Sequence, residues 1–340
     1  MDVRVRIDKG RYEKLLRLAE NNGVSVEDYA ERVLRASMDK QASPRLQALN
    51  AFEQLNSRQQ DILMHLVNLR LATREQVGNL FGRYPHDESA NIAGSRALVI
   101  LQDLGLAEEH RIQFRIPGRA TRKLFSATDL GVYVDQVLRG RKRITSVPRP
   151  YPPRLISPER LPHYLDVVDV ASAFATARNK AYGSLAEIEL EATLWTFPHL
   201  GSLRRIRPDS FGLFLASDQV LPFAVEVVRN EFMNSLIRKI RNYAFFYSSG
   251  AYITETLDYP TLLLVASGKA GADHLCKSVV YGMLQAFLSV STASKNIPVG
   301  VTTLTQLAQE GPFLPIWGRP LHGDLVGFLE LYADSSNRLS

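Results

Sequence analysis

The stretch RPDSFGLFLASDQVLPFAVEVVRNE, residues 207–231, contains two apolar runs separated by the polar turn ASDQ. Both runs have the length of strands and are rich in β-branched and aromatic side chains, which predicts strands over 210–216 and 221–228. A turn centred on ASDQ places Asp209 opposite Glu226 across the resulting hairpin. We therefore expect two carboxylates to meet at the ends of neighbouring strands.

Paired carboxylates at strand ends suit a hard cation such as Mg²⁺, which could activate water against a phosphodiester. The pattern resembles the PD-(D/E)xK nucleases, with Pro208 and Asp209 as the PD pair and Glu226 as the second acid. Val228 stands where that motif has its lysine, and valine supplies no charge. An active centre would bind the metal through Asp209 and Glu226 and would take Lys239, from the following helix, as its third catalytic residue.

Simpler interpretations of the same residues remain open. Asp209 follows a proline and is typical of a residue that caps a turn. Glu226 is a candidate for a structural ion pair with Arg229 or Lys239. Tyr243 precedes two phenylalanines and is typical of a core residue.

The chain around this hairpin alternates helical and strand patterns, which indicates an α/β domain over 163–335. Helices are expected over 163–181 and 231–250, and a further strand is expected over TLLLVAS, 261–267. Preceded by PHYLDVVDVASAF, the segments RPDS, AVEVVRNE and LIRKIRNYAFFY are similar to the replication-relaxation family of plasmid and integrative-element proteins. That resemblance spans about residues 55–300 and implies a function in replication, mobilisation or transfer of a mobile element. It implies importance for His163, Asp209, Glu226, Arg229, Glu231, Lys239 and Tyr243.

Positive charge gathers between residues 111 and 150, although the formal net charge of the chain is only +6. Ten basic residues stand there against Asp129 and Asp135, which makes a polyanion the first partner to consider. The basic residues are Arg111, Arg115, Arg119, Arg122, Lys123, Arg139, Arg141, Lys142, Arg143 and Arg149.

Residues 53–140 have the pattern of a winged helix-turn-helix domain. Helix signals in NSRQQDILMHLVNLR, TREQVGNLFG and ESANIAGSRALVILQDLG precede two alternating runs that flank a Pro-Gly turn. The third helix, with Arg96 exposed, would enter a DNA groove, and the basic hairpin would rest on flanking phosphates. The alternative is a winged helix that contacts protein. The hairpin residues expected to bind DNA are Arg115, Arg119, Arg122 and Lys123.

The first 40 residues resemble a ribbon-helix-helix repressor, with one alternating strand, DVRVRID, and two short helices. So small a unit cannot bury enough apolar surface alone, so we expect a homodimer that pairs the N-terminal strands. The resemblance implies that Arg4 and Arg6 face base edges and that the helix start at Ser25 holds a phosphate. The alternative is that this N-terminal strand joins a larger sheet and that its arginines are only solvated.

Two connecting segments complete the chain. DKQASPRLQA, residues 39–48, is expected to be a linker. Residues 141–162 are expected to be a basic, proline-rich linker in which Arg141, Lys142 and Arg143 track phosphates. The lone Cys276 excludes an intrachain disulfide, and no apolar run reaches the ~20 residues that span a bilayer, which predicts a cytoplasmic protein without membrane contact.

These patterns predict an α+β multidomain protein: a ribbon-helix-helix arm, a winged helix and an α/β restriction-endonuclease-like C-terminal domain. The favoured hypothesis is a sequence-specific protein that binds double-stranded DNA of a bacterial mobile element, with a nuclease-like domain whose active centre has been lost or altered. One alternative is a Mg²⁺-dependent endonuclease or nickase. Another is an assembly factor that recruits a relaxase or replication protein.

Overall fold

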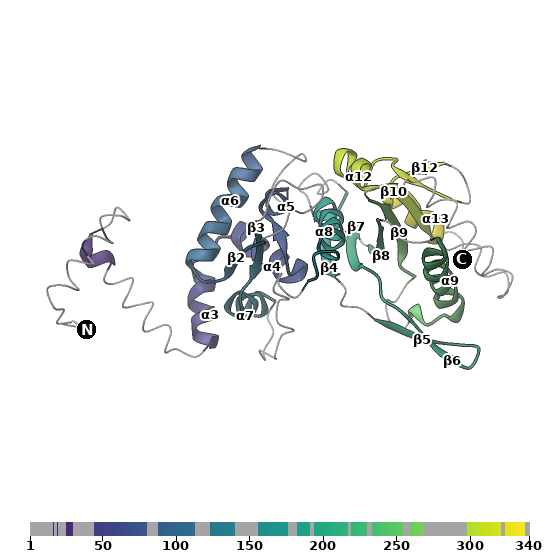
Figure 1. Ribbon diagram of the computed structural model, residues 1–340, viewed down its shortest axis with the longest axis horizontal. Helices are drawn as coiled ribbons and strands as arrows, with labels where there is room; N and C mark the ends of the chain where they lie inside the picture. Colours follow the sequence, from purple (N-terminus) through teal and green to yellow (C-terminus); the bar gives the residue numbers. More distant parts are fainter. Residues whose placement is uncertain are drawn as a thin grey trace.

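The chain folds as a mixed α+β protein in a computed structural model (Figure 1). Labels follow Figure 1. The structure describes residues 16, 19, 25–29, 44–79, 88–112, 123–139, 156–175, 182–190, 194–216, 219–229, 233–253, 259–267, 298–320 and 324–336.

An N-terminal unit of helices surrounds a small antiparallel sheet whose strand order is β1-β3-β2. Two capping boxes within it explain where α4 and α5 begin. Asn56 and Gln59 exchange side chain to backbone hydrogen bonds at the start of α4, and Thr73 and Gln76 do so at the start of α5. The elements are α3 (Pro44–Glu53), α4 (Ser57–Leu69), β1 (Ala72–Thr73), α5 (Arg74–Asn79), α6 (Glu88–Asp103), β2 (Ala107–Arg111), β3 (Lys123–Ala127) and α7 (Asp129–Leu138).

The linker predicted over 39–48 is wrong for its second half, because residues 44–48 form the start of α3. Ala48 and Ala51 on this helix are fully or nearly fully buried and belong to the core that α4 and α7 also line. The mostly polar composition of residues 39–48 gave no signal that Ala48 packs in a core. The described part of the helical unit therefore begins at Pro44.

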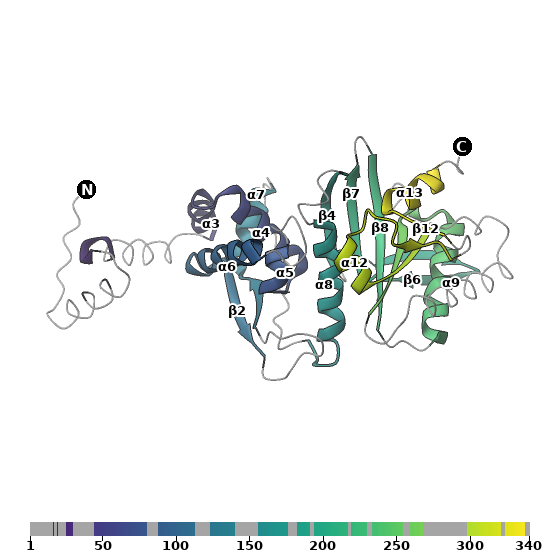
Figure 2. The same ribbon diagram turned by 90° about the horizontal axis from the view of Figure 1, so that it is seen from above.

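Helix α8 (Leu161–Ala175) lies between the N-terminal unit and a large sheet, and both ribbon views agree on this placement (Figures 1 and 2). Polar contacts fix α8 to the first unit. The Tyr164 hydroxyl donates to the Leu69 carbonyl at 2.6 Å, and Gln76 Nε2 donates to the Leu165 carbonyl at 2.8 Å and to Asp169 Oδ1 at 2.6 Å. The buried apolar residues of the first unit, α8 and one face of the sheet form one continuous core.

Among the residues that the structure describes, the large sheet has seven strands in the order β12-β11-β10-β9-β8-β7-β4. Strands β8, β9 and β10 run parallel to one another, and β7 pairs antiparallel with β8. The strands predicted at 210–216, 221–228 and 261–267 are confirmed, with small differences at their ends. The strands are β4 (Ser184–Leu190), β7 (Ser210–Ala216), β8 (Gln219–Val228), β9 (Thr261–Ala266), β10 (Val299–Thr303), β11 (Trp317–Gly318) and β12 (Leu325–Val326).

Two layers cover the two faces of this sheet. Helices α8, α12 (Leu304–Glu310) and α13 (Phe328–Ser336) pack on one face, around the stacked rings of Phe174 and Phe223. Helix α9 (Met233–Ser249) packs on the other face, where Ala224 and Val228 of β8 contact its apolar side. Alternate residues of β8 therefore lie in two different cores, as expected of a strand buried on both faces.

A separate two-stranded hairpin, β5 (Trp195–His199) and β6 (Ser202–Ile206), projects beyond the large sheet beside α9 (Figure 1). Trp195 stacks on Phe246 of α9 with ring centroids 5.0 Å apart. Within the described ranges, no helix is both long enough and apolar enough to cross a bilayer.

Candidate functional site

The predicted register of the β7–β8 hairpin is confirmed, because Ser210 pairs with Val225 and Ala216 with Gln219. Asp209 therefore lies across from Glu226. Its backbone N–H donates to the Val225 carbonyl at 3.0 Å, and its Oδ2 accepts a hydrogen bond from the Val227 N–H at 2.8 Å. Local strand pairing thus holds the first carboxylate in place.

The second oxygen of Asp209 faces α8. Oδ1 lies 3.2 Å from His163 Nε2, and this pair joins the helix to the end of the strand. Burial alone would raise the pKa of Asp209, but the hydrogen bond and charge of His163, with the charge of Lys239, outweigh it and lower that pKa. Burial would lower the pKa of His163, but Asp209 outweighs it and raises the pKa of the imidazole.

Glu226 is only 1% exposed and faces α9. Lys239 Nζ donates to its Oε2 at 2.9 Å, and the Tyr243 hydroxyl donates to its Oε1 at 2.8 Å. Helix α9 thus directs a lysine back to the strand, as the sequence predicts. Burial and the neighbouring charge of Asp209 raise the pKa of Glu226 to about 8, against the opposing effects of Lys239 and Tyr243.

This arrangement does not fit a Mg²⁺ site. A hard cation needs several open oxygen ligands, yet each oxygen of Asp209 and Glu226 already has a protein partner. Burial raises the pKa of Glu226, which disfavours the ionised carboxylate that a metal ion needs as a ligand. Among the described residues, no three or more His, Cys, Asp or Glu side chains lie close enough together to bind a metal ion.

Arg229 belongs to a different cluster, and the alternative that it pairs with Glu226 is wrong. Its guanidinium lies 2.5 Å from Asp166 Oδ2 on α8, and Ser267 after β9 donates to the same carboxylate. Asp166 is 5% exposed. The cluster ties α8 to the carboxyl ends of two parallel strands.

Sequence reasoning did not single out Asp166 or Ser267. A signal was present in HYLDVVD, where His163, Asp166 and Asp169 recur at a spacing of three. Polar side chains at that spacing follow one side of a helix, and in an otherwise apolar helix they need buried partners. The three contact Asp209, Arg229 and Gln76 respectively.

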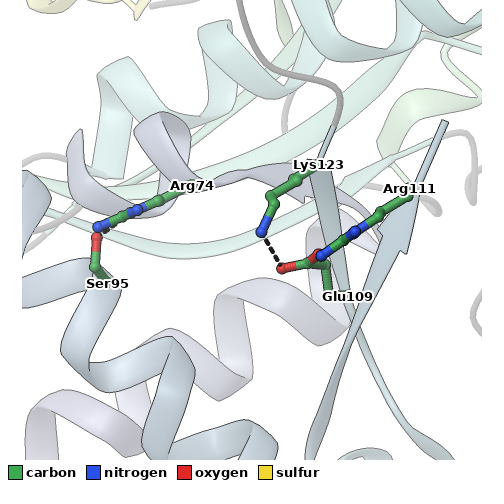
Figure 3. Close-up of polar contacts among 5 residues, drawn as sticks. All are labelled: Arg74, Ser95, Glu109, Arg111 and Lys123. Carbon is green, nitrogen blue, oxygen red and sulfur yellow. Dashed lines mark hydrogen bonds and ion pairs between the residues drawn. The ribbon is translucent and has the colours of Figure 1, made fainter. Parts of the chain in front are cut away.

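The N-terminal unit carries a second candidate surface on α6. Arg96 is exposed, and Ile92 and Val99 beside it are 53% and 55% exposed. Arg74, the first residue of α5, donates from Nε to the Ser95 hydroxyl on α6 (Figure 3). This side of α6 thus exposes a cationic side chain between two apolar ones.

Strands β2 and β3 carry two cations, Arg111 and Lys123, beside two acids, Glu108 and Glu109. Lys123 Nζ and Arg111 Nε each lie 3.0 Å from an oxygen of Glu109 (Figure 3). The hydrogen bond from Lys123 lowers the pKa of Glu109 most, and Arg111 adds to the effect. The Arg111 side chain is 79% exposed and that of Lys123 is 50% exposed, so both cations also face solvent.

Several predicted site residues lie outside the described part of the chain. Ser25, in contrast, lies within the described part. Its hydroxyl accepts a hydrogen bond from the Asp28 N–H at 3.0 Å, which confirms that a helix starts at this serine. The residues outside are Arg4, Arg6, Arg115, Arg119, Arg122, Arg141, Lys142, Arg143 and Glu231.

Comparisons of this chain with protein-family models, with curated proteins and with solved structures gave no match. The resemblances drawn from the sequence motifs therefore stay predictions.

Proposed function

We propose that this protein binds double-stranded DNA through its N-terminal half and acts in the replication, mobilisation or transfer of a bacterial mobile element. The order of elements from α4 to β3 is compatible with a winged helix in which α6 is the recognition helix. The exposed apolar side chains Ile92 and Val99 beside Arg96 suit a major groove, where thymine methyl groups and guanine acceptors lie together.

One observation carries the proposal. Exposed Arg111 ends β2 and exposed Lys123 begins β3, and both pair with Glu109. The segment 112–122 between them adds three arginines and no acid. Such a concentration of cations is typical of a surface that binds phosphates. In this proposal the C-terminal domain is a nuclease-like fold in which the carboxylate pair stabilises the structure.

The arginines of the wing are expected to supply much of the affinity for DNA. Replacing Arg115, Arg119 and Arg122 with alanine should weaken binding at least ~10-fold at 150 mM salt and reduce the slope of log K against log salt by roughly 2 to 3. Fluorescence anisotropy with a labelled duplex from 50 to 300 mM NaCl measures both quantities. The matched control replaces exposed Arg58 and Arg238, which lie on α4 and α9. Equal losses in both variants would contradict the wing assignment.

Phosphodiester cleavage is not expected from the carboxylate pair. Purified protein incubated with supercoiled plasmid and Mg²⁺ or Mn²⁺ should leave the plasmid supercoiled, because the oxygens of Asp209 and Glu226 already have protein partners. The position of Lys239 beside Glu226 is a feature that favours the nuclease alternative. Nicking that disappears in Glu226→Ala would overturn this expectation and establish an endonuclease.

A further inference from the structure

The β5–β6 hairpin carries an exposed apolar tip. Leu200 is 85% exposed and Leu203 is 70% exposed. The other face of the hairpin is buried: Trp195 and Phe197 pack on α9, and His199 stacks on Phe245 with ring centroids 3.8 Å apart. The hairpin is therefore held firmly along its length while its two leucines face solvent.

The tip combines a strained backbone conformation with exposed apolar side chains. Leu200 and Gly201 form the two-residue turn with φ of 47° and 74°. Such a turn favours asparagine or glycine at its first position, because a side chain with a Cβ is strained there. Leucine at position 200 thus helps neither the turn nor solubility, which indicates that its side chain is needed for a contact.

The charge of the hairpin identifies the class of partner. Arg204, Arg205 and Arg207 follow the tip, and residues 194–207 contain no acidic residue. Arg205 and Arg207 are exposed, and in the described part of the chain the Nε of Arg204 is buried without a hydrogen-bond partner. A hairpin with two exposed arginines and no acid in its sequence attracts a polyanion.

We propose that this hairpin is a second DNA contact, in which Leu200 and Leu203 wedge between base pairs from the minor groove while Arg205 and Arg207 bind the flanking phosphates. Apolar wedges combined with arginines are the means by which architectural proteins unstack and bend a duplex. Arg205 lies two residues from Leu203, roughly 7 Å along the strand, so it would reach the phosphates beside the wedge. The proposal rests on the DNA binding proposed above and adds the bending of the duplex.

Two hairpin variants test the wedge. Leu200→Asn combined with Leu203→Ser removes the apolar tip, and asparagine suits the backbone at position 200, so the thermal midpoint should be unchanged or higher. Arg205→Ala combined with Arg207→Ala removes only the charge. The wing triple variant serves as the matched control, because it should weaken binding without removing the wedge.

Binding and bending are measured on the full chain with a ~30-base-pair duplex that carries a fluorophore at each end and a central 2-aminopurine. We expect wild-type protein to raise energy transfer and 2-aminopurine fluorescence. The leucine variant should lose at least ~80% of both signals at saturation while its Kd changes less than ~5-fold. The arginine variant should weaken binding ~3- to 10-fold and reduce the salt slope by about 1 to 2.

The outcomes separate the two proposals. If wild-type protein binds no duplex, the proposed function fails and the wedge fails with it. If wild-type protein binds but the leucine variant bends and unstacks DNA as well as wild type does, only the wedge is overturned. Loss of self-association or of binding to anionic vesicles in the leucine variant, with bending unchanged, would likewise overturn the wedge and assign the tip to a second copy or to a lipid surface.

Discussion

Replacing Asp166 with alanine is expected to lower the free energy of unfolding by roughly 3 kcal/mol, because it leaves a largely buried guanidinium without its counter-charge. Arg229 is 23% exposed and Asp166 is 8% exposed at the side chain. The same substitution removes the acceptor of the Ser267 hydroxyl. The contacts of α8 with the ends of β8 and β9 should therefore weaken together.

Urea denaturation followed by circular dichroism measures this loss. A matched control is available in Arg319 and Asp324, a pair of the same types at the surface, where Asp324 is 46% exposed. Asp324→Ala should cost less than about 1 kcal/mol, as surface pairs do. A loss for Asp166→Ala no larger than this control would contradict a structural function of the cluster.

The double variant Asp166→Leu with Arg229→Met measures the coupling between the two residues directly. A buried ion pair replaced by apolar groups of similar volume is often close to neutral, whereas removal of one partner is costly. The double variant should therefore be more stable than either Asp166→Leu or Arg229→Met alone. The coupling energy from this cycle should exceed about 1 kcal/mol.

The parts of the fold that the sequence predicts are those fixed by local patterns. The β7–β8 hairpin has two strong apolar runs and a short polar turn, so its register could be predicted before any tertiary contact was known. The reach of Lys239 to Glu226 could also be predicted, since a helix packed on a sheet can direct one long side chain to the strand. Both Asn56 and Thr73 carry the side-chain pattern that marks a helix start.

The parts that could not be predicted depend on pairing between distant segments. Strands β11 and β12 have two residues each, which is too short for a periodic signal, and they exist because β10 and the rest of the sheet provide an edge. The partner of Asp166 is 63 residues away along the chain, and that of Gln76 is 93 residues away. Sequence spacing on α8 shows that polar side chains share a face, but it does not show which strand end or helix they contact.

A second large effect is expected at Glu226, as a change in the dependence of stability on pH. The pKa of this carboxyl group is about 8 in the folded chain and 4.5 in its ordinary state. A raised folded pKa means that the folded protein holds a proton which the unfolded chain has released between these two values. Stability is therefore greatest below pH 4.5 for this group and falls as the pH rises towards 8.

The fall is expected to be roughly 1 kcal/mol per pH unit in this window, since a single extra proton corresponds to about 1.4 kcal/mol per unit at most. The raised pKa of His163 acts with the same sign, because its contribution is lost as the pH rises above 6.5. Asp209 acts outside this window, because its lowered pKa gives stability that is lost only as the pH falls below 3.8.

Glu226→Gln removes the titration while it preserves the shape of the neutral side chain. The variant should match wild type within about 1 kcal/mol at pH 5 and exceed it by roughly 3 kcal/mol at pH 8, because the amide has no proton to lose. Urea midpoints at half-unit steps from pH 5 to 8.5 measure the two curves. His163→Gln is the matched control, and it should leave the slope between pH 5 and 6.5 unchanged.

Parallel curves for wild type and Glu226→Gln would mean that Glu226 is already ionised at neutral pH and pairs with Lys239 as a charge. In that case the raised pKa would no longer argue against metal binding. The occupied oxygens of Asp209 and Glu226, and the lack of a cluster of three ligating side chains among the described residues, would still oppose it. Diverging curves would establish a neutral carboxyl group in a largely buried network with Lys239 and Tyr243. A group that stabilises the fold by keeping its proton is unsuited to bind Mg²⁺ at the same pH, so the pH profile tests the structural assignment of the pair independently of any cleavage assay.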